Sequence, residues 1–344
     1  MKPRRSSPTL LLLAGVLLPV ACAPLLCNEL PLFARGEAPL MPALVAASPR
    51  DFLGLALWLA LLLAGFRRWK GALLAIFVGV LAALVAPEEH VAAVADADVV
   101  LGAFAPFSPQ SVERSFGESQ LARHVLGVDR HGRDLFALLL HGTRDSLLCA
   151  ALVTLAATLL GAFTGAAAAL VRNPVSAMLS SALQALDAFP ALLAVLVLQS
   201  LFFPSFVFVL VLLVLFRWPA VHRIVLGEVE RLQREPWCAA ARADGASWWW
   251  LFLEEMLPHL HGLLAAQAAL GIAIVIAIES GLAWLGFGVP APALSLGALL
   301  RLGQEDLPFV TPLLVLSIVL ITGISGVALL SARRLQHAPQ EDAA

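Results

Sequence analysis

Two carboxylates lie within long apolar runs, where an ionisable group could bind a proton, an ion or a polar solute. Glu279 lies well inside the run Leu263–Leu285, and Asp187 lies within the run Met178–Phe203. If these runs cross a membrane, a charge at mid-bilayer costs about 2.5–3.5 kcal/mol on insertion scales, so Glu279 must face protein or water. Two interpretations stay open for Glu279: it lines a polar path, or it braces one helix against another.

A proline and two arginines accompany the second carboxylate. Pro190 follows shortly after Asp187, and a proline within a helix frees the carbonyl about one turn earlier and permits a kink. We interpret Pro190 either as a hinge or as a tolerated proline beside an interfacial acid. Arg217 and Arg223 lie toward one end of the run Ser205–Leu226. We expect both to reach the membrane interface, since long basic side chains can bury their stems and keep the charge in water.

Motifs of the common enzyme and nucleotide sites are missing from the sequence. It contains no G-x-S-x-G, H-E-x-x-H or G-x-x-x-x-G-K-[ST] pattern. His259 and His261 are only a pair, and the four cysteines lack metal-ligand spacing. We interpret the cysteines as small packing residues (Cys22, Cys27, Cys149 and Cys238). The sequence therefore predicts no enzymatic activity, no metal site and no cofactor bound by this chain.

Composition indicates a membrane protein. Of the 344 residues, 60% are hydrophobic and 13% are charged, and the mean hydropathy is +0.89. Soluble domains carry about 25% charged residues, so we expect an integral membrane protein in contact with lipid. The net charge of -2 argues against nucleic acid as a partner.

Eight apolar stretches qualify, or nearly qualify, as membrane-spanning helices, which need about 20 residues each. The second and third are short, and the charged turn Arg67–Lys70 separates them. The stretches are Thr9–Cys27, Phe52–Phe66, Gly71–Ala86, Ser146–Val171, Met178–Phe203, Ser205–Leu226, Leu263–Leu285 and Phe309–Ala332. They predict an all-α, polytopic membrane helix bundle of about eight transmembrane helices.

The distribution of Lys and Arg orients these spans, because cytoplasmic loops are enriched in positive charge. Lys2, Arg4 and Arg5 place the N-terminus in the cytoplasm, and eight crossings place the C-terminus there as well. A cleavable signal peptide with its cleavage site near Ala21-Cys22-Ala23 is the alternative for residues 1–27. The apolar run continues past that site, which favours a retained span.

A polar segment, Cys238–Leu260, interrupts the apolar sequence on the predicted cytoplasmic side. Pro236 suits the first turn of a helix, and Gly245 suits the left-handed position that follows a helix C-terminus. Ser247 can cap a second helix, and we expect Pro258 to break the chain before the next span. The segment is thus predicted to form a ledge of two short helices under the membrane. The triplet Trp248-Trp249-Trp250 is interpreted as its interfacial anchor.

The order of these residues resembles the EAA motif of permease subunits of binding-protein-dependent ABC importers. That motif is Glu-Ala-Ala, then Gly, then Leu-Pro about a dozen residues further on. Its positions are held here by Ala239, Ala240, Ala241, Gly245, Leu257 and Pro258, with Ala239 in place of the usual Glu. In the family this coupling helix docks on the cytoplasmic ATPase, so the resemblance implies the same role here.

Three further segments resemble the dipeptide, oligopeptide and nickel branch of that family. Arg217–Val229 is similar to its Trp-Pro followed by Arg, and Ile278–Pro292 to its E-A-S-L-S-F-L-G-L-G run. His124–Leu148 resembles its H-x-L-G-T-D-x-x-G-R-D segment, with matches at Gly127, Asp129, Gly132, Arg133 and Asp134. We expect this last motif outside the membrane, as an outer gate or docking point, or as a loop that holds two helices together.

The resemblance implies a domain organisation, partners and a substrate class. Residues 1–90 are an N-terminal membrane region, 91–144 an extracytoplasmic loop, 145–335 a permease core of about five spans with a coupling segment at 228–262, and 336–344 a cytoplasmic tail. The implied partners in a bacterial inner membrane are a second permease subunit, two cytoplasmic ATPase subunits that bind ATP and Mg, and an extracytoplasmic substrate-binding protein. Peptides or similar small polar solutes are the implied cargo.

Two alternatives come from other functional classes. A secondary transporter would use Glu279 and Asp187 as ion or proton sites. A membrane scaffold that transports nothing would use the polar segment to recruit a cytoplasmic partner.

Overall fold

The computed structural model describes residues 33–35, 98–101, 126–129, 131–171, 173–202, 205–288, 294–305 and 311–336. Within these ranges every regular element is a helix, except for a short antiparallel pair formed by β1 (Phe33–Arg35) and β2 (Asp98–Leu101). The helical fold is therefore confirmed for the described spans, and the strand pair is an addition to the predicted all-α fold. The first three predicted spans and the alternative cleavage site lie outside the described residues.

Four described helices are long and apolar enough to cross a membrane, and they match four of the five predicted C-terminal spans. In place of the fifth is a bent pair of shorter helices, α8 and α9. The four are α7 (Leu135–Leu170), α10 (Phe206–Leu232), the continuous stretch from α12 (Trp248–Trp250) through η1 (Leu251–Met256) to α13 (Leu257–Trp284), and α15 (Thr311–Gln336).

Polar side chains cap the first turns of these helices. Asp134 Oδ1 accepts a hydrogen bond from the backbone N–H of Ala137 (2.7 Å), so α7 begins at Leu135 rather than at the predicted Ser146. Asn173 caps α8 and Ser205 caps α10 in the same way. Hydropathy alone missed the first turns of α7 because the largely polar run at 141–146 separates them from the longer apolar stretch that follows.

The predicted span Met178–Phe203 is not one helix but two, and the break falls at the proline for which a kink was predicted. It consists of α8 (Pro174–Asp187) and α9 (Ala191–Leu201), which are bent by 89°. Pro190 has no N–H to donate to the carbonyl of Leu186, which instead accepts from the backbone N–H of Phe189 (3.1 Å). The α-helix therefore ends before the proline, and a new helix begins after it.

The break predicted at Pro258 is wrong. The chain stays helical from Trp248 to Trp284, and Pro258 lies in the first turn of α13 directly after the π-helical segment η1. A π-helical turn changes the hydrogen-bond register, so the missing N–H of the proline does not interrupt the helix.

The contacts divide the chain into two units, residues 1–148 with 291–321, and residues 149–290 with 322–344. In the first unit, α14 (Leu296–Glu305) packs against the first turns of α7 and was not predicted from the sequence. The hydroxyl of Ser146 accepts from the backbone N–H of Leu296 (2.9 Å), and Asp145 Oδ2 accepts from that of Leu294 (3.2 Å). Two polar residues of α7 therefore fix where α14 begins.

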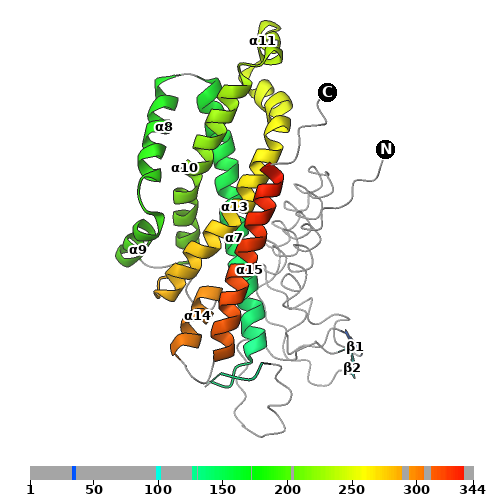
Figure 1. The fold of residues 1–344 in the computed structure, drawn as a ribbon, viewed down its shortest axis with the longest axis vertical. Helices are drawn as coiled ribbons and strands as arrows, with labels where there is room; N and C mark the ends of the chain where they lie inside the picture. The colour runs from blue at the N-terminus through cyan, green and yellow to red at the C-terminus, as the bar shows by residue number, and fades with distance from the viewer. Residues whose placement is uncertain are drawn as a thin grey trace. The chain divides into compact units, whose positions relative to one another are not determined.

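The second unit is organised around close packing of α7 on α10 (Figure 1). A Cβ added to Gly161 would lie 2.5 Å from the Cβ of Val221, and one added to Gly165 would lie 2.7 Å from the carbonyl oxygen of His222. Small residues spaced by four allow this approach of two helix backbones. We call this contact the α7–α10 seam.

Buried hydrogen bonds reinforce the seam and connect it to α8. His222 is only 1% exposed, and its Nδ1 lies 3.1 Å from the hydroxyl of Thr164 in α7. Its Nε2 lies 3.1 Å from the hydroxyl of Ser180 in α8. Trp218 Nε1 also donates to Thr164 (2.9 Å), while Thr164 donates to the carbonyl of Leu160 (2.7 Å). Thr164 has one proton, so this arrangement is fully satisfied when His222 carries its proton on Nδ1.

Candidate coupling segment and intramembrane polar groups

The polar segment after α10 forms the short helix α11 (Pro236–Ala243), as predicted from its turn residues. Gly245 has φ +83°, the left-handed conformation that favours glycine. The backbone N–H of Ala246 donates to the carbonyl of Ala241, and that of Gly245 to the carbonyl of Arg242 (both 3.1 Å). These are the two bonds of a Schellman C-cap. Ser247 then caps α12, as predicted, by accepting from the N–H of Trp250 (3.3 Å).

The two faces of α11 have different surroundings. Cys238 is fully buried in an apolar cluster, and Ala241 packs against that cluster. Ala239 and Ala240 are exposed. Successive residues of an α-helix are about 100° apart, so the three alanines do not share one face. The cluster joins α7, α10, α11, η1 and α13 through Ala166, Ala169, Val221, Val225, Val229, Leu232, Cys238, Leu251, Phe252, Met256 and Leu260.

The end of the segment also divides between core and surface. Leu257 packs against the apolar cluster, whereas Pro258 is exposed. The ring of Trp237 stacks on that of His259, with centroids 5.2 Å apart and an interplanar angle of 9°. The start of α13 therefore holds α11 from one side.

A chain of hydrogen bonds ties α11 to the C-terminal end of α7. Arg242 Nη2 donates to Gln233 Oε1 (2.7 Å), and Gln233 Nε2 donates to the carbonyl of Ala169 (3.0 Å). That carbonyl belongs to the last turn of α7, where no later helical N–H reaches it. With the buried cluster and the stacked rings, these bonds attach α11 to the ends of three long helices.

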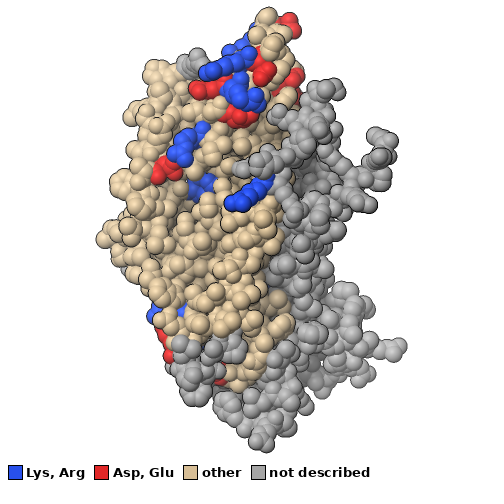
Figure 2. Space-filling view, in the orientation of Figure 1, with Lys and Arg blue, Asp and Glu red and all other residues tan. Residues whose placement is uncertain are grey.

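Charged side chains gather on the second unit around α11 and the adjoining end of α10, above a largely uncharged surface (Figure 2). Arg231 contacts Glu228 (2.7 Å) and Glu235 (3.6 Å) there. The three tryptophans of α12 are 38–47% exposed, and Trp249 makes an edge contact with Phe163. This is the arrangement that an aqueous end, an aromatic belt and an apolar band of a membrane protein produce.

Arg217 was predicted to reach the membrane interface, but it is buried. It is 7% exposed, and its Nη2 donates to both the backbone oxygen and the Oε1 of Gln267 (3.3 Å each). Gln267, on α13, is also buried and offers two acceptors inside the bundle. Sequence reasoning missed this partner, although an amide inside an apolar run is itself a signal of an interhelical hydrogen bond.

The Arg217–Gln267 contact makes a prediction for stability. Gln267→Leu is expected to lower the free energy of unfolding by about 1–3 kcal/mol, because it takes one acceptor from a buried guanidinium. The double variant Arg217→Leu with Gln267→Leu removes both polar groups and should recover most of that loss. Thermal unfolding of the purified variants measures both effects. A double variant less stable than Gln267→Leu would contradict this account.

The two predicted intramembrane acids have different environments. Glu279 is 1% exposed within α13, so it faces protein rather than lipid in this structure. Asp187, the last residue of α8, binds Arg223 of α10, with Oδ2 and Nη1 2.6 Å apart. Pro190 begins the bend that follows. Arg223 therefore points to a carboxylate, and the hinge interpretation of Pro190 stays a prediction.

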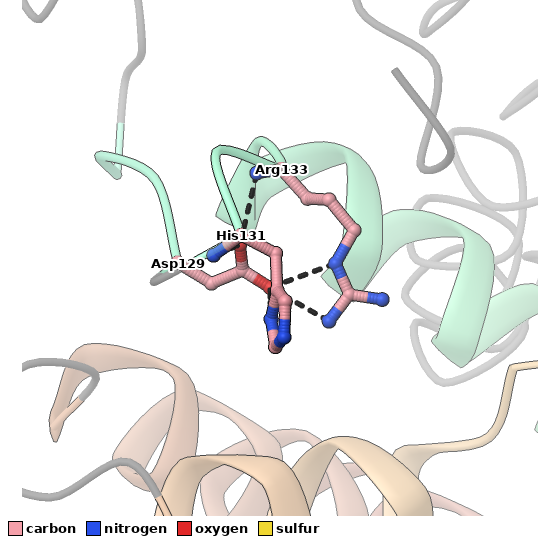
Figure 3. Close-up of polar contacts among 3 residues, drawn as sticks. All are labelled: Asp129, His131 and Arg133. Atoms are coloured by element: carbon pink, nitrogen blue, oxygen red, sulfur yellow. Dashed lines mark hydrogen bonds and ion pairs between the residues drawn. The ribbon is translucent and has the colours of Figure 1, made fainter. Parts of the chain in front are cut away.

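The predicted outer motif in the first unit is built around Asp129 (Figure 3). Its Oδ1 accepts from the backbone N–H groups of His131 (2.8 Å) and Arg133 (2.9 Å). Its Oδ2 accepts from Arg133 Nε (2.8 Å) and lies 2.7 Å from Arg133 Nη2. Two guanidinium nitrogens on one oxygen and two backbone donors on the other thus surround this buried carboxylate.

The remaining residues of the outer motif connect this turn to α7. Gly127 and Gly132 have φ of +86° and +78°, which permits the tight reversal. The backbone N–H of Leu135 donates to the carbonyl of Gly127 (3.1 Å), and Asp134 caps α7. These contacts favour the interpretation as a loop that orients the start of α7. The outer gate and docking roles stay predictions.

Comparison with known proteins gives the family. The profile of the family described as "Binding-protein-dependent transport system inner membrane component" matches residues 157–337. A dipeptide transport system permease protein of Bacillus subtilis is 31% identical over 205 residues, covering 58% of this chain and 64% of the relative. An oligopeptide transport system permease protein of Haemophilus influenzae is 29% identical over 184 residues, covering 54% and 59%. An inner membrane ABC transporter permease protein of Escherichia coli is 29% identical over 199 residues, covering 57% and 58%.

The matched region contains α11, the α7–α10 seam and four of the candidate spans or parts of them. The chain therefore belongs to the family of inner membrane components of binding-protein-dependent transport systems, as a multi-pass permease component without a catalytic role of its own.

Proposed function

We propose that this chain is a permease subunit of an ATP-driven importer and that α11 couples it to a cytoplasmic ATPase. One observation carries the proposal: α11 exposes Ala239 and Ala240 while it buries Cys238 in the cluster shared with α7, α10 and α13. A partner that presses on the small exposed face moves a helix that is fixed to three long helices. The absence of Glu at Ala239 removes one polar contact and leaves this mechanical connection in place.

The rest of the assembly follows from the family. Two ATPases bind ATP and Mg, a second permease subunit completes the path, and a substrate-binding protein delivers solute from outside. Small peptides are the proposed cargo, supported by the dipeptide and oligopeptide transport systems to which the Bacillus and Haemophilus relatives belong. Both chain termini and α11 lie on the cytoplasmic side in this proposal, and the outer motif lies opposite. The proposed permease core comprises residues 145–335, and the proposed coupling segment comprises residues 228–262.

Cross-linking in the complete transporter tests the coupling role. Ala240→Cys, with the native cysteines replaced, should be joined to the ATPase subunit by a short cross-linker that carries a maleimide at one end and a photoreactive group at the other. Met178→Cys is the matched control, because Met178 is 78% exposed but lies on α8. Equal cross-linking of both variants, or none at residue 240, would contradict the docking of α11. Uptake that continues without the ATPases and stops when the ion gradient collapses would instead show a secondary transporter.

A further inference from the structure

An ion pair lies on a largely apolar part of the exposed surface of α8, α9 and α10. Arg223 Nη1 and Asp187 Oδ2 are 2.6 Å apart, and their side chains are 59% and 21% exposed. Around the bend after α8, large apolar side chains are exposed as well, including Phe189 and Leu193. Lipid would suit these apolar side chains, but it would not suit an exposed guanidinium.

The carboxylate partner of Arg223 lies at the end of α8 that is remote from the aqueous end of the second unit. The helix α8 begins shortly after Ala169. The carbonyl of Ala169 accepts a hydrogen bond from Gln233, which lies between α10 and α11. It has 14 residues and is therefore about 21 Å long, and Asp187 is its last residue. Figure 1 shows α8 alongside α10, running away from the end that carries α11. Arg223 therefore reaches toward the membrane interior, not toward the charged end.

The bond to Asp187 uses only part of the Arg223 guanidinium. Apart from its bond to Asp187, Arg223 makes no hydrogen bond to another residue in the part of the chain that the structure describes. One edge of its guanidinium thus faces outward with its donors available. These outward-facing donors, held in place by Asp187, suit an anion.

We propose that Arg223, oriented by Asp187, is a carboxylate-binding site on the translocation path of this permease. An exposed charge inside the membrane requires water, and in a permease the water-filled surface is the path of the solute. The planar guanidinium binds a carboxylate through two parallel hydrogen bonds. Phe189 and Leu193 supply apolar surface beside it, so the site fits the C-terminal end of a small peptide. This inference rests on the proposed function.

Charged thiol reagents test whether the surface is aqueous and positive. In the complete transporter without native cysteines, Phe189→Cys should react with an anionic methanethiosulfonate faster than with a cationic one. Arg223→Gln should lower the ratio of the two rates by at least about fivefold, since it removes a nearby positive charge. Arg231→Gln is the matched control, because Arg231 is exposed at the charged end of the same helix and should leave the ratio unchanged. No reaction with either reagent, or a ratio that Arg223→Gln leaves unchanged, would overturn the proposal.

Protection by peptides identifies the source of the carboxylate. A tripeptide with a free C-terminal carboxylate should slow the reaction of Phe189→Cys, and its C-terminal amide should not. Equal protection by both, or protection only by anionic lipid vesicles, would overturn the assignment to the solute. ATP-driven uptake measured in the same vesicles separates the two proposals. Vesicles that show no ATP-driven uptake contradict the importer, whereas uptake without charge-selective labelling contradicts only this site.

Discussion

Gly245→Pro is expected to abolish ATP-driven uptake while the subunit remains in the membrane. Proline fixes φ near -65°, whereas Gly245 has φ +83°, and proline has no N–H to donate to the carbonyl of Arg242. The combined cost is about 3 kcal/mol or more, which a short surface helix cannot absorb. The Schellman turn then opens, and the exposed face of α11 loses its fixed position relative to α13. Uptake into proteoliposomes and ATP hydrolysis by the assembled complex measure the loss.

Gly245→Asn is the matched control for this variant. Asparagine tolerates the left-handed conformation better than other residues with side chains, and it keeps the backbone N–H. Nothing lies within 4 Å of a Cβ added at this position, so the side chain has room. We expect uptake close to that of the natural sequence. Normal uptake by Gly245→Pro would show that α11 does not transmit force to the bundle.

Local turn chemistry explains why α11 was predictable from the sequence. Pro236, Gly245 and Ser247 each act within a few residues of their own position, and the helix, the C-cap and the next N-cap all appear where expected. The Asp129 turn was predictable for the same reason, since glycines and a carboxylate close it locally. These features could be predicted from the sequence because no distant residue is needed to form them.

Features that depend on distant partners were predicted poorly. Arg217 turns inward because Gln267, on another helix, offers it two acceptors. The outcome at Pro190 and at Pro258 depends on how the hydrogen bonds of the neighbouring turns rearrange. The chain bends by 89° at Pro190, whereas the helix continues through Pro258. Proline thus marks a perturbed helix, but tertiary packing decides between a bend and continuation.

The α7–α10 seam was only partly predictable, because it combines a local sequence pattern with a distant partner surface. Gly161 and Gly165 have the spacing of close helix packing, which the sequence displays openly. What the sequence does not display is the partner surface, formed by Val221, His222 and Val225 on a helix some 60 residues later. The seam also fixes Thr164 beside His222 and brings Ala169 to Gln233. Gly161 and Gly165 therefore contribute to the support of α11, because they allow the approach of α7 to α10 that brings Ala169 to Gln233.

Gly165→Val is expected to separate α7 from α10 and so to lower both stability and transport. Its Cβ alone would lie 2.7 Å from the carbonyl oxygen of His222 and 3.0 Å from the backbone nitrogen of Leu226. Backbone atoms cannot rotate away, so the helices must shift, at a cost of about 1–3 kcal/mol or more for overpacking. The hydrogen bond from Gln233 to Ala169 then weakens, and α11 loses one of its supports. Thermal unfolding in detergent and ATP-driven uptake should both report the loss.

Gly227→Ala separates this packing effect from the general effect of replacing a helical glycine. Gly227 lies on α10, and nothing lies within 4 Å of its added Cβ. Alanine in a helix interior is favoured over glycine by about 0.5–1 kcal/mol, so this variant should unfold at the same or a higher temperature. Uptake should stay unchanged, because the α7–α10 seam is intact. If Gly165→Val unfolds at the temperature of Gly227→Ala, the two helices do not pack through their glycines, and α11 must take its support from the buried cluster around Cys238 and from the stacked rings of Trp237 and His259.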